Sequence, residues 1–471
     1  MSTYQSNVTS AFVDLATYDA LEAYLYGGDD AVTYFVRQHR KSTWFSQVPV
    51  VLSNASGTAD FGNQWSVTIS RAGDYLLNTW LETNTPTVIS TEVVTNVADY
   101  NLFWAKNFMH NLVEECTITF NDLIAARFDS TQLDFWSAFT VPASKKSGYR
   151  TMTGYGVETL SANGRDSVFL RGVSAEESHK FSLPLPFFYS RESGVALPTA
   201  ALPYNDMRIN FRFRPLSSLL YVYEPAELKA ATSATNTHYT GGTAALTGTR
   251  VWANYAVVSN DERKLMGTAT RDIAIEQMQA APITSYTTTG NSTYDLRFSH
   301  GVKALMFALR AKDPAKEGIV AGVGAVGGIG GDSLSRYDTS SLAELTDGEA
   351  DSFNRKSPID NVTLLYENTT RLGSVPSSYF TQVGPYYHAE AIPTDEAGIH
   401  MYSYALDLMS VDPCGSTNYG RLTNVSIVPA ATEDIKTPIT GDGNDAWDLV
   451  VNAINHNIVR ISGGALGFPI L

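Results

Sequence analysis

Alternation of apolar and polar residues is the most frequent pattern along this chain of 471 residues. The clearest case is the segment 207–214, in which four apolar side chains alternate with Asn210 and three arginines. Because successive side chains of a strand point to opposite faces, this segment is predicted to be a β-strand with one buried face. Similar patterns predict strands at 66–70, 75–81, 115–120, 251–258, 271–279, 293–299, 303–310, 361–366, 400–408, 421–428 and 448–461.

Only three short segments are predicted to be helical. The first lies within residues 11–28, where Thr17 is the expected N-cap and two glycines follow the apolar positions. The second spans 132–139. The third is expected to run from about 260 to 267, because the sequence Ser-Asn-Asp-Glu at 259–262 has the spacing of a capping box with Ser259 at the cap. The first helix would pack on its own domain or form an arm that binds a neighbouring subunit or an underlying layer.

Long polar connections separate the predicted strands, at 84–101, 143–178, 215–248, 311–358 and 429–446. Many short strands with such loops favour sandwiches or barrels. The predicted fold is all-β with two large domains, long surface loops and few short helices, and each domain is long enough for an eight-stranded jelly roll. The double jelly roll itself, two such rolls in tandem, is implied by the family resemblance described below. The expected domains are an N-terminal arm with a short helix (1–30), a first jelly roll (31–258), a helical linker (259–269) and a second jelly roll (270–471). We also expect the linker helix to fix the angle between the rolls.

The composition excludes several classes of protein. The 33 lysines and arginines are outnumbered by 48 aspartates and glutamates, giving a net charge of −15, which opposes direct binding of nucleic acid. The basic run 37–41 is interpreted as a solvated local patch. Two cysteines, Cys116 and Cys414, are too few for a disulfide framework and are expected to be buried. The first residues lack the pattern of a secretory signal, so we expect folding in aqueous, reducing surroundings.

No motif marks an active site. Residues 322–327 have the spacing G-x-G-x-x-G, but further glycines follow where a phosphate-binding helix would have to begin, which favours a flexible loop. The Asn-x-Ser/Thr patterns at Asn7, Asn54, Asn291, Asn361, Asn368 and Asn424 are interpreted as compositional. The histidines lie apart, at His39, His110, His179, His238, His300, His388, His400 and His456. We therefore predict no catalytic, metal-binding or cofactor-binding residue.

Longer blocks of residues are more specific than any of these motifs. They are Thr33–Arg37, Thr43–Val50, Phe108–Leu112, Thr119–Leu123, Leu183–Phe188, Gly194–Asn205, Leu296–His300, Leu365–Thr369, Gly415–Gly420 and Ile461–Pro469. In this order, across nearly the whole chain, they resemble the major capsid proteins of iridoviruses. The Gly-rich segment 311–358 is the part that least resembles the family.

The resemblance implies a structural shell protein and not an enzyme. It implies two jelly rolls in tandem, three chains in each capsomer, and a pseudo-hexagonal outline. It further implies a virion shell over an internal lipid membrane, assembled in the cytoplasm of the infected host cell. The expected partners are two further copies in a homotrimer, neighbouring capsomers and minor capsid proteins, and the N-terminal arm would face the membrane or a minor capsid protein.

Two other functions are compatible with a jelly-roll fold. A carbohydrate-binding jelly roll would bind glycans saturably. A β-sandwich glycoside hydrolase would need two carboxylates roughly 5–9.5 Å apart in a cleft. The sequence marks out no such pair of carboxylates.

Overall fold

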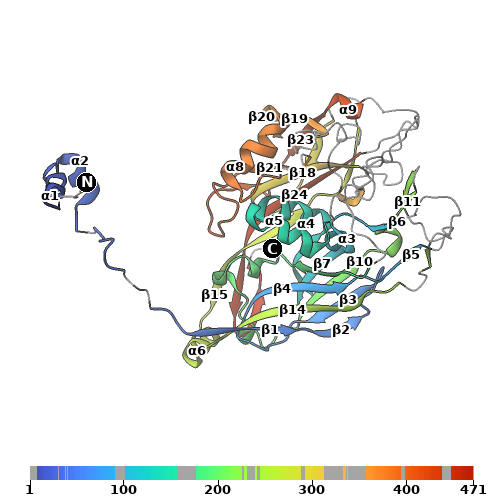
Figure 1. Ribbon diagram of the computed structural model, residues 1–471, viewed down its shortest axis with the longest axis horizontal. Coiled ribbons are helices and arrows are strands. Elements are labelled where there is room, and N and C mark those ends of the chain that lie inside the picture. The colour runs from blue at the N-terminus through green and yellow to red at the C-terminus, as the bar shows by residue number, and fades with distance from the viewer. Residues whose placement is uncertain are drawn as a thin grey trace, which may run out of the picture. The chain divides into compact units, whose positions relative to one another are not determined.

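The computed structural model describes residues 8–29, 31–37, 39, 41–90, 101–155, 177–224, 227–230, 239–240, 244–287, 292–311, 333–335, 337, 357–393, 398–436 and 447–469 (Figure 1). Its contacts divide the chain into two units, Met1–Trp44 and Phe45–Leu471. Much of every long predicted loop, including the glycines at 322–327, lies outside the described residues.

The N-terminal unit contains two short helices where the sequence predicted one. Helix α1 spans Val8–Ala16 and α2 spans Ala20–Tyr26. The side chain of Asp19 accepts a hydrogen bond from the backbone N–H of Leu21 and so caps α2. The prediction that Thr17 is the N-cap was therefore wrong, because the Thr17 hydroxyl donates instead to the carbonyl of Asp14 near the end of α1. No residue of either helix is buried.

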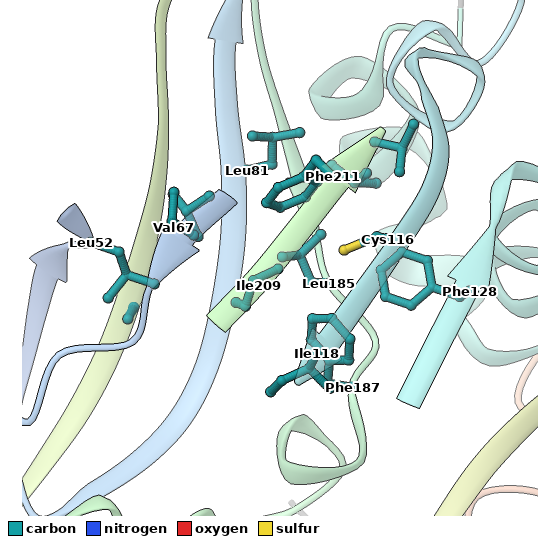
Figure 2. Packing of buried hydrophobic residues seen from close by; sticks show 14 of the residues in the cluster. Leu52, Val67, Leu81, Cys116, Ile118, Phe128, Leu185, Phe187, Ile209 and Phe211 are labelled. Carbon is teal, nitrogen blue, oxygen red and sulfur yellow. The ribbon is translucent and has the colours of Figure 1, made fainter. Parts of the chain in front are cut away.

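Two sheets pack around the core of the first roll. Sheet A has the order β1-β14-β4-β9 and sheet B the order β2-β3-β10-β7-β8. Their strands are β1 Phe45–Val51, β2 Ser53–Gly57, β3 Gln64–Thr68, β4 Tyr75–Asn84, β7 Val113–Phe120, β8 Leu123–Asp129, β9 Lys180–Pro184, β10 Met207–Phe213 and β14 Thr247–Val258. Strand β10 alternates between buried and more exposed residues as predicted. Figure 2 shows Ile209 and Phe211 of β10 among the side chains of neighbouring strands.

Two further sheets form the second roll. Sheet C has the order β15-β24-β18-β21 and sheet D the order β17-β23-β19-β20. Their strands are β15 Arg271–Ala280, β17 Tyr294–Leu296, β18 Gly301–Ala311, β19 Ile359–Tyr366, β20 Thr369–Pro376, β21 His400–Ser403, β23 Val425–Ala431 and β24 Trp447–Ser462. The short strands β16 Thr284–Tyr286, β22 Thr417–Asn418 and β25 Ala465–Gly467 extend sheet C.

The two rolls have the same topology. If β2 is set aside, the eight strands of sheets A and B, numbered along the chain, lie in the orders 1-8-3-6 and 2-7-4-5. The eight principal strands of sheets C and D follow the same two orders. Two small sheets are formed by strands that lie, in the sequence, between strands of the first roll. One contains β6 Asn101–Trp104, β11 Leu220–Glu224 and β12 Glu227–Ala230, and the other contains β5 Ile89–Ser90 and β13 Tyr239–Thr240. The predicted double jelly roll is confirmed.

The helices lie in the connections between strands. They are α3 Phe108–Leu112, α4 Ser130–Thr140, α5 Ala143–Thr153, α6 Asn260–Thr268, the π-helix η8 Tyr379–Val383, α8 Gly384–His388 and α9 Glu433–Lys436. The 3-10 turns are η1 Phe188–Ser190, η2 Ser193–Val195, η3 Thr199–Ala201, η4 Leu216–Ser218 and η6 Ser333–Ser335. Helix α4 confirms the prediction at 132–139, and α6 the one at 260–267.

Three local predictions were wrong. The Ser259 side chain makes no capping hydrogen bond at α6, whereas Asp129 and Gln132 form a complete capping box at α4. The strand expected at 400–408 ends at Ser403, because the Ser403 hydroxyl bonds the backbone of Ala405 in a turn. The loop expected at 143–178 begins with helix α5.

Candidate functional site

Helix α4 lies between the two rolls (Figure 1). Its apolar side chains pack on the face of sheet C that points away from the core of the second roll. We call this group the junction core: Phe135, Ala138, Phe139, Ala304, Met306, Ala308, Tyr337, Ile399, Met401, Leu408, Val450 and Ile454. The intervening residues of β18, such as Leu305 and Phe307, belong to the core of the second roll. Sheet C is therefore buried on both faces there, which explains the unbroken burial at the start of β24.

Asp134 of α4 is a buried carboxylate that accepts four hydrogen bonds. Its Oδ1 accepts from Asn107 Nδ2 at 3.1 Å and from His110 Nδ1 at 2.7 Å. Its Oδ2 accepts from Ser335 Oγ at 2.7 Å and from the Tyr337 hydroxyl at 3.0 Å. Ser335 and Tyr337 belong to the connection between β18 and β19. The carboxylate therefore joins the helices of the first roll to a segment of the second.

The same group includes a histidine that no sequence pattern had marked out. His110 Nε2 lies 2.7 Å from the hydroxyl of Tyr149 on α5. A carboxylate that orients an imidazole, which in turn contacts a hydroxyl, is an arrangement that can activate a nucleophile in an active site. Here the carboxylate and the imidazole are fully buried, and the carboxylate oxygens accept four hydrogen bonds. We assign this group a structural role, since a buried charge needs such partners to be stable.

A second buried polar group crosses the junction. Lys303 of β18 is fully buried, and its Nζ donates to Glu276 Oε1 of β15 at 2.6 Å and to the carbonyl of Leu408 at 2.8 Å. It also donates to the carbonyl of Ser410. Arg191, from the connection between β9 and β10, donates to Glu276 Oε2 at 2.7 Å and to the carbonyl of Leu408 at 3.1 Å. One carboxylate thus binds a cation from each roll.

Most of the side chains beside this group are apolar. The guanidinium of Arg191 lies 4.4 Å from the ring centroid of Trp136 on α4. A cavity of about 20 Å³ beside it is lined by Trp136, Phe187, Arg191 and Ile454, among others, and has room for roughly one water molecule. The cavity is too small for a substrate or a cofactor.

A wider groove of about 360 Å³ crosses the outer face of sheet B. Half of the lining residues carry hydroxyl or amide side chains, and Glu115 and Arg212 are the charged ones. Glu115 is the one carboxylate among the lining residues and forms an ion pair with Arg212. The groove therefore lacks the carboxylate pair that glycoside hydrolysis needs.

The other candidate residues are dispersed. In the described part of the chain, no group of three or more His, Cys, Asp or Glu side chains could hold a metal ion. Cys116 is buried, which raises the pKa of its thiol well above the usual value, whereas Cys414 is half-buried, contrary to prediction. Of the Asn-x-Ser/Thr sites, Asn54 and Asn368 are exposed, and Asn7 and Asn291 lie outside the described residues.

His400 of β21 is fully buried, and its ring stacks on Phe307 with the centroids 5.1 Å apart. Its Nε2 lies 3.0 Å from Ser357 Oγ. Burial disfavours the charged imidazolium and lowers the pKa of His400 from 6.5 to about 4. Its ring is therefore neutral in the folded protein near pH 7.

Acidification is expected to destabilise the fold through His400. Between pH 6.5 and about 4 the unfolded chain binds a proton that the folded protein does not, so stability is lost as the pH falls through this window. The loss at pH 4 should approach roughly 3 kcal/mol for this one group. Urea denaturation of the parent protein and of His400→Leu at several pH values measures it, with exposed His39→Leu as control. Equal pH slopes in the parent and His400→Leu would contradict the assignment.

The N-terminal unit carries many exposed apolar side chains. Each of the following is at least 59% exposed: Val8, Phe12, Val13, Leu15, Tyr18, Leu21, Tyr24, Leu25, Tyr26, Val32, Tyr34, Phe35, Val36 and Trp44. So much uncovered apolar surface is typical of a segment that binds a partner. None of the described helices is long and apolar enough to cross a bilayer.

Solved structures with the same fold are viral capsid proteins. The PBCV-1 virus capsid gives a TM-score of 0.68 at 20% identity, covering 93% of this chain and 100% of that one. The Faustovirus major capsid protein gives a TM-score of 0.68 at 12% identity, covering 94% and 96%. The fold is therefore that of the double jelly-roll capsid proteins.

Sequence comparisons identify the family. A model described as "Major capsid protein N-terminus" matches residues 33–258, and one described as "Large eukaryotic DNA virus major capsid protein" matches residues 262–467. The chain is 49% identical to the major capsid protein of Tipula iridescent virus over 98% of both chains, and 39% identical to that of Frog virus 3 over 99% of both. The chain belongs to the major capsid protein family of iridoviruses and other large eukaryotic DNA viruses. This is a family of structural proteins and not of enzymes.

Proposed function

We propose that the chain is the major shell-forming protein of its virus and assembles into homotrimeric, pseudo-hexagonal capsomers that tile the outer shell. The observation that supports this most directly is the shared strand order of the two rolls. One chain presents two similar walls, so three chains around a three-fold axis present six. Neighbouring capsomers would then meet along six similar edges.

The proposal includes the domain division expected from the sequence: an arm at 1–30, rolls at 31–258 and 270–471, and a linker at 259–269. The exposed apolar side chains of α1 and α2 support a role for the arm in binding a minor capsid protein or the internal membrane. Assembly in the host cytoplasm is compatible with two cysteines that are both free. A carbohydrate-binding or hydrolytic function has less support, since the groove on sheet B lacks a catalytic pair.

The size of the purified protein tests the proposal. Analytical ultracentrifugation is expected to give three times the chain mass of 51.3 kDa, and negative-stain micrographs are expected to show particles with a hexagonal outline. A variant that begins at Phe45 should keep this size, because the described part of the removed segment contains no buried residue. It should also lose binding to lipid vesicles if the arm faces the membrane. A parent protein that stays monomeric at every concentration would contradict the proposal.

A further inference from the structure

The repeated topology relates two helical segments that share no sequence pattern. Helix α4 follows the fifth strand of the first roll, β8, and precedes the sixth, β9. The segment formed by η8 and α8 follows the fifth strand of the second roll, β20, and precedes the sixth, β21. The two helical segments therefore occupy the same place in their respective rolls.

The two segments differ in how they are covered. Helix α4 is buried on both sides, because it packs on its own roll through Leu133 and on sheet C through Phe135 and Phe139. The segment η8–α8 buries only one side, which includes Phe380 and Pro385. Its other side leaves an aromatic surface uncovered.

We call this surface the α8 patch. It consists of Val383 (47% exposed), Tyr386 (69%) and Tyr387 (71%), with Leu406 (76%) beside them. The rings of Tyr386 and Tyr387 meet edge to face with centroids 5.0 Å apart. His388 Nδ1 lies 3.0 Å from the carbonyl of Leu406, which holds this part of the chain against α8. Exposed, locally fixed aromatic side chains of this kind are typical of interface hot spots.

Sheet A is the counterpart of sheet C, but its outer face is open. Val251 and Ala253 of β14 belong to the core of the first roll, so Trp252 between them points outward. Trp252 pairs with Trp80 of β4 and with Val51 of β1 in the register of the sheet. The two indoles stack 6.0 Å apart at an interplanar angle of 7°, and neither belongs to the core.

Val51, Trp252 and Trp80 form a row across three neighbouring strands that we call the sheet A patch. Val51 is 42% exposed, and both indoles are half-buried. The guanidinium of Arg250 lies 5.5 Å from the Trp252 ring and forms an ion pair with Glu82, so the row has a charged border. Trp and Arg are the residues most enriched at interface hot spots. The outer face of sheet A therefore has the composition of an interface, and it corresponds to the face of sheet C that α4 covers.

From these observations, and resting on the proposed trimer, we infer that the α8 patch of one copy docks on the sheet A patch of a second copy. The contact reproduces between chains the packing of α4 on sheet C within a chain. The contact joins two different surfaces, the α8 patch of one copy and the sheet A patch of the next, so the interface is heterologous. Such an interface closes into a ring when it is repeated by rotation about the three-fold axis. Three chains then have six similar junctions, three within chains and three between them.

Substitutions on each patch test the inference in ultracentrifugation and native mass spectrometry. Both Tyr386→Ser/Tyr387→Ser and Val51→Glu change exposed side chains, so the chain should fold, which circular dichroism checks. Each variant alone is expected to be monomeric at concentrations where the parent protein is trimeric, with association weakened about 100-fold or more. Tyr204→Ser removes a side chain that is 74% exposed outside both patches and should leave the trimer intact.

Mixing the two variants tests the direction of the contact. The Val51→Glu chain keeps a functional α8 patch, and the double tyrosine variant keeps a functional sheet A patch. In a mixture, one chain of each kind should therefore form one intact junction. Chemical cross-linking of the mixture should give heterodimers but no closed trimers. Variants that stay trimeric, or a mixture that stays monomeric, would overturn the inference. A parent protein that is itself monomeric would instead overturn the proposed function.

Discussion

The Glu276→Ala variant is expected to lose about 3–5 kcal/mol in the free energy of unfolding, as measured by urea denaturation. The reason is that Glu276 is the carboxylate that binds both Lys303 and Arg191 at the junction of the rolls. The side chains of the two cations are 0% and 7% exposed, so neither would be well solvated once the carboxylate was removed. An unpaired buried charge is far less stable than a buried neutral side chain.

A triple variant provides the matched control. Glu276→Leu together with Lys303→Met and Arg191→Met removes all three charges and keeps most of the volume. Replacing a whole buried ion group by apolar side chains often leaves stability unchanged or increases it. We therefore expect the triple variant to be clearly more stable than Glu276→Ala. If both variants lost the same stability, packing volume and not charge pairing would dominate at this position.

Asp134→Ala is expected to have a similar effect, a loss of about 3–5 kcal/mol in the same measurement. Its carboxylate accepts hydrogen bonds from four side chains, and the variant would remove this shared buried acceptor. Two of the donors, Ser335 and Tyr337, come from the second roll. Limited proteolysis should therefore cut the connection between β18 and β19 sooner in the variant than in the parent protein.

Asp272→Ala is the control for this change. Asp272 also binds an arginine, Arg460, at 2.7 Å, but both side chains are about half exposed. Water replaces the lost partner there, so the stability should change little. A large loss from Asp272→Ala, or a small one from Asp134→Ala, would show that burial does not decide the effect.

These buried groups also bear on how the rolls are held together. The linker helix α6 was expected to fix their angle, yet Met266 is its only buried residue. The helix is tied to the first roll by Arg263, which binds both oxygens of Asp74. By contrast, α4 contributes the junction core and Asp134, and it packs Trp136 on Arg191. The geometry thus favours α4 over α6 as the element that sets the relation of the rolls.

Local sequence patterns were sufficient to predict most of the principal strands of the two rolls. All the segments predicted as strands overlap a strand of the structure, because a half-buried strand must alternate along its own residues. Strand β1 was missed because it is an edge strand containing Pro49, and almost all of its residues are exposed. A strand with no buried face has no reason to alternate.

The candidate sites show a different limit. No sequence pattern connects Asp134 with Ser335, which lies 201 residues further along the chain, or Lys303 with Leu408. Each of these side chains is unremarkable in its own segment. Their importance arises from burial and from the partners that the fold brings to them, and neither property is encoded over a short range of sequence.

The sequence by itself therefore determined the all-β class, most of the principal strands of the two rolls and, through extended blocks of residues, the family. Those features depend on alternation and residue identity along the chain, which can be read directly. Only the tertiary structure decided that the two rolls share one topology, that α4 is buried between them, and that the α8 patch and the sheet A patch remain open. Burial is a property of segments that meet in space, so it becomes visible only when the whole chain is folded.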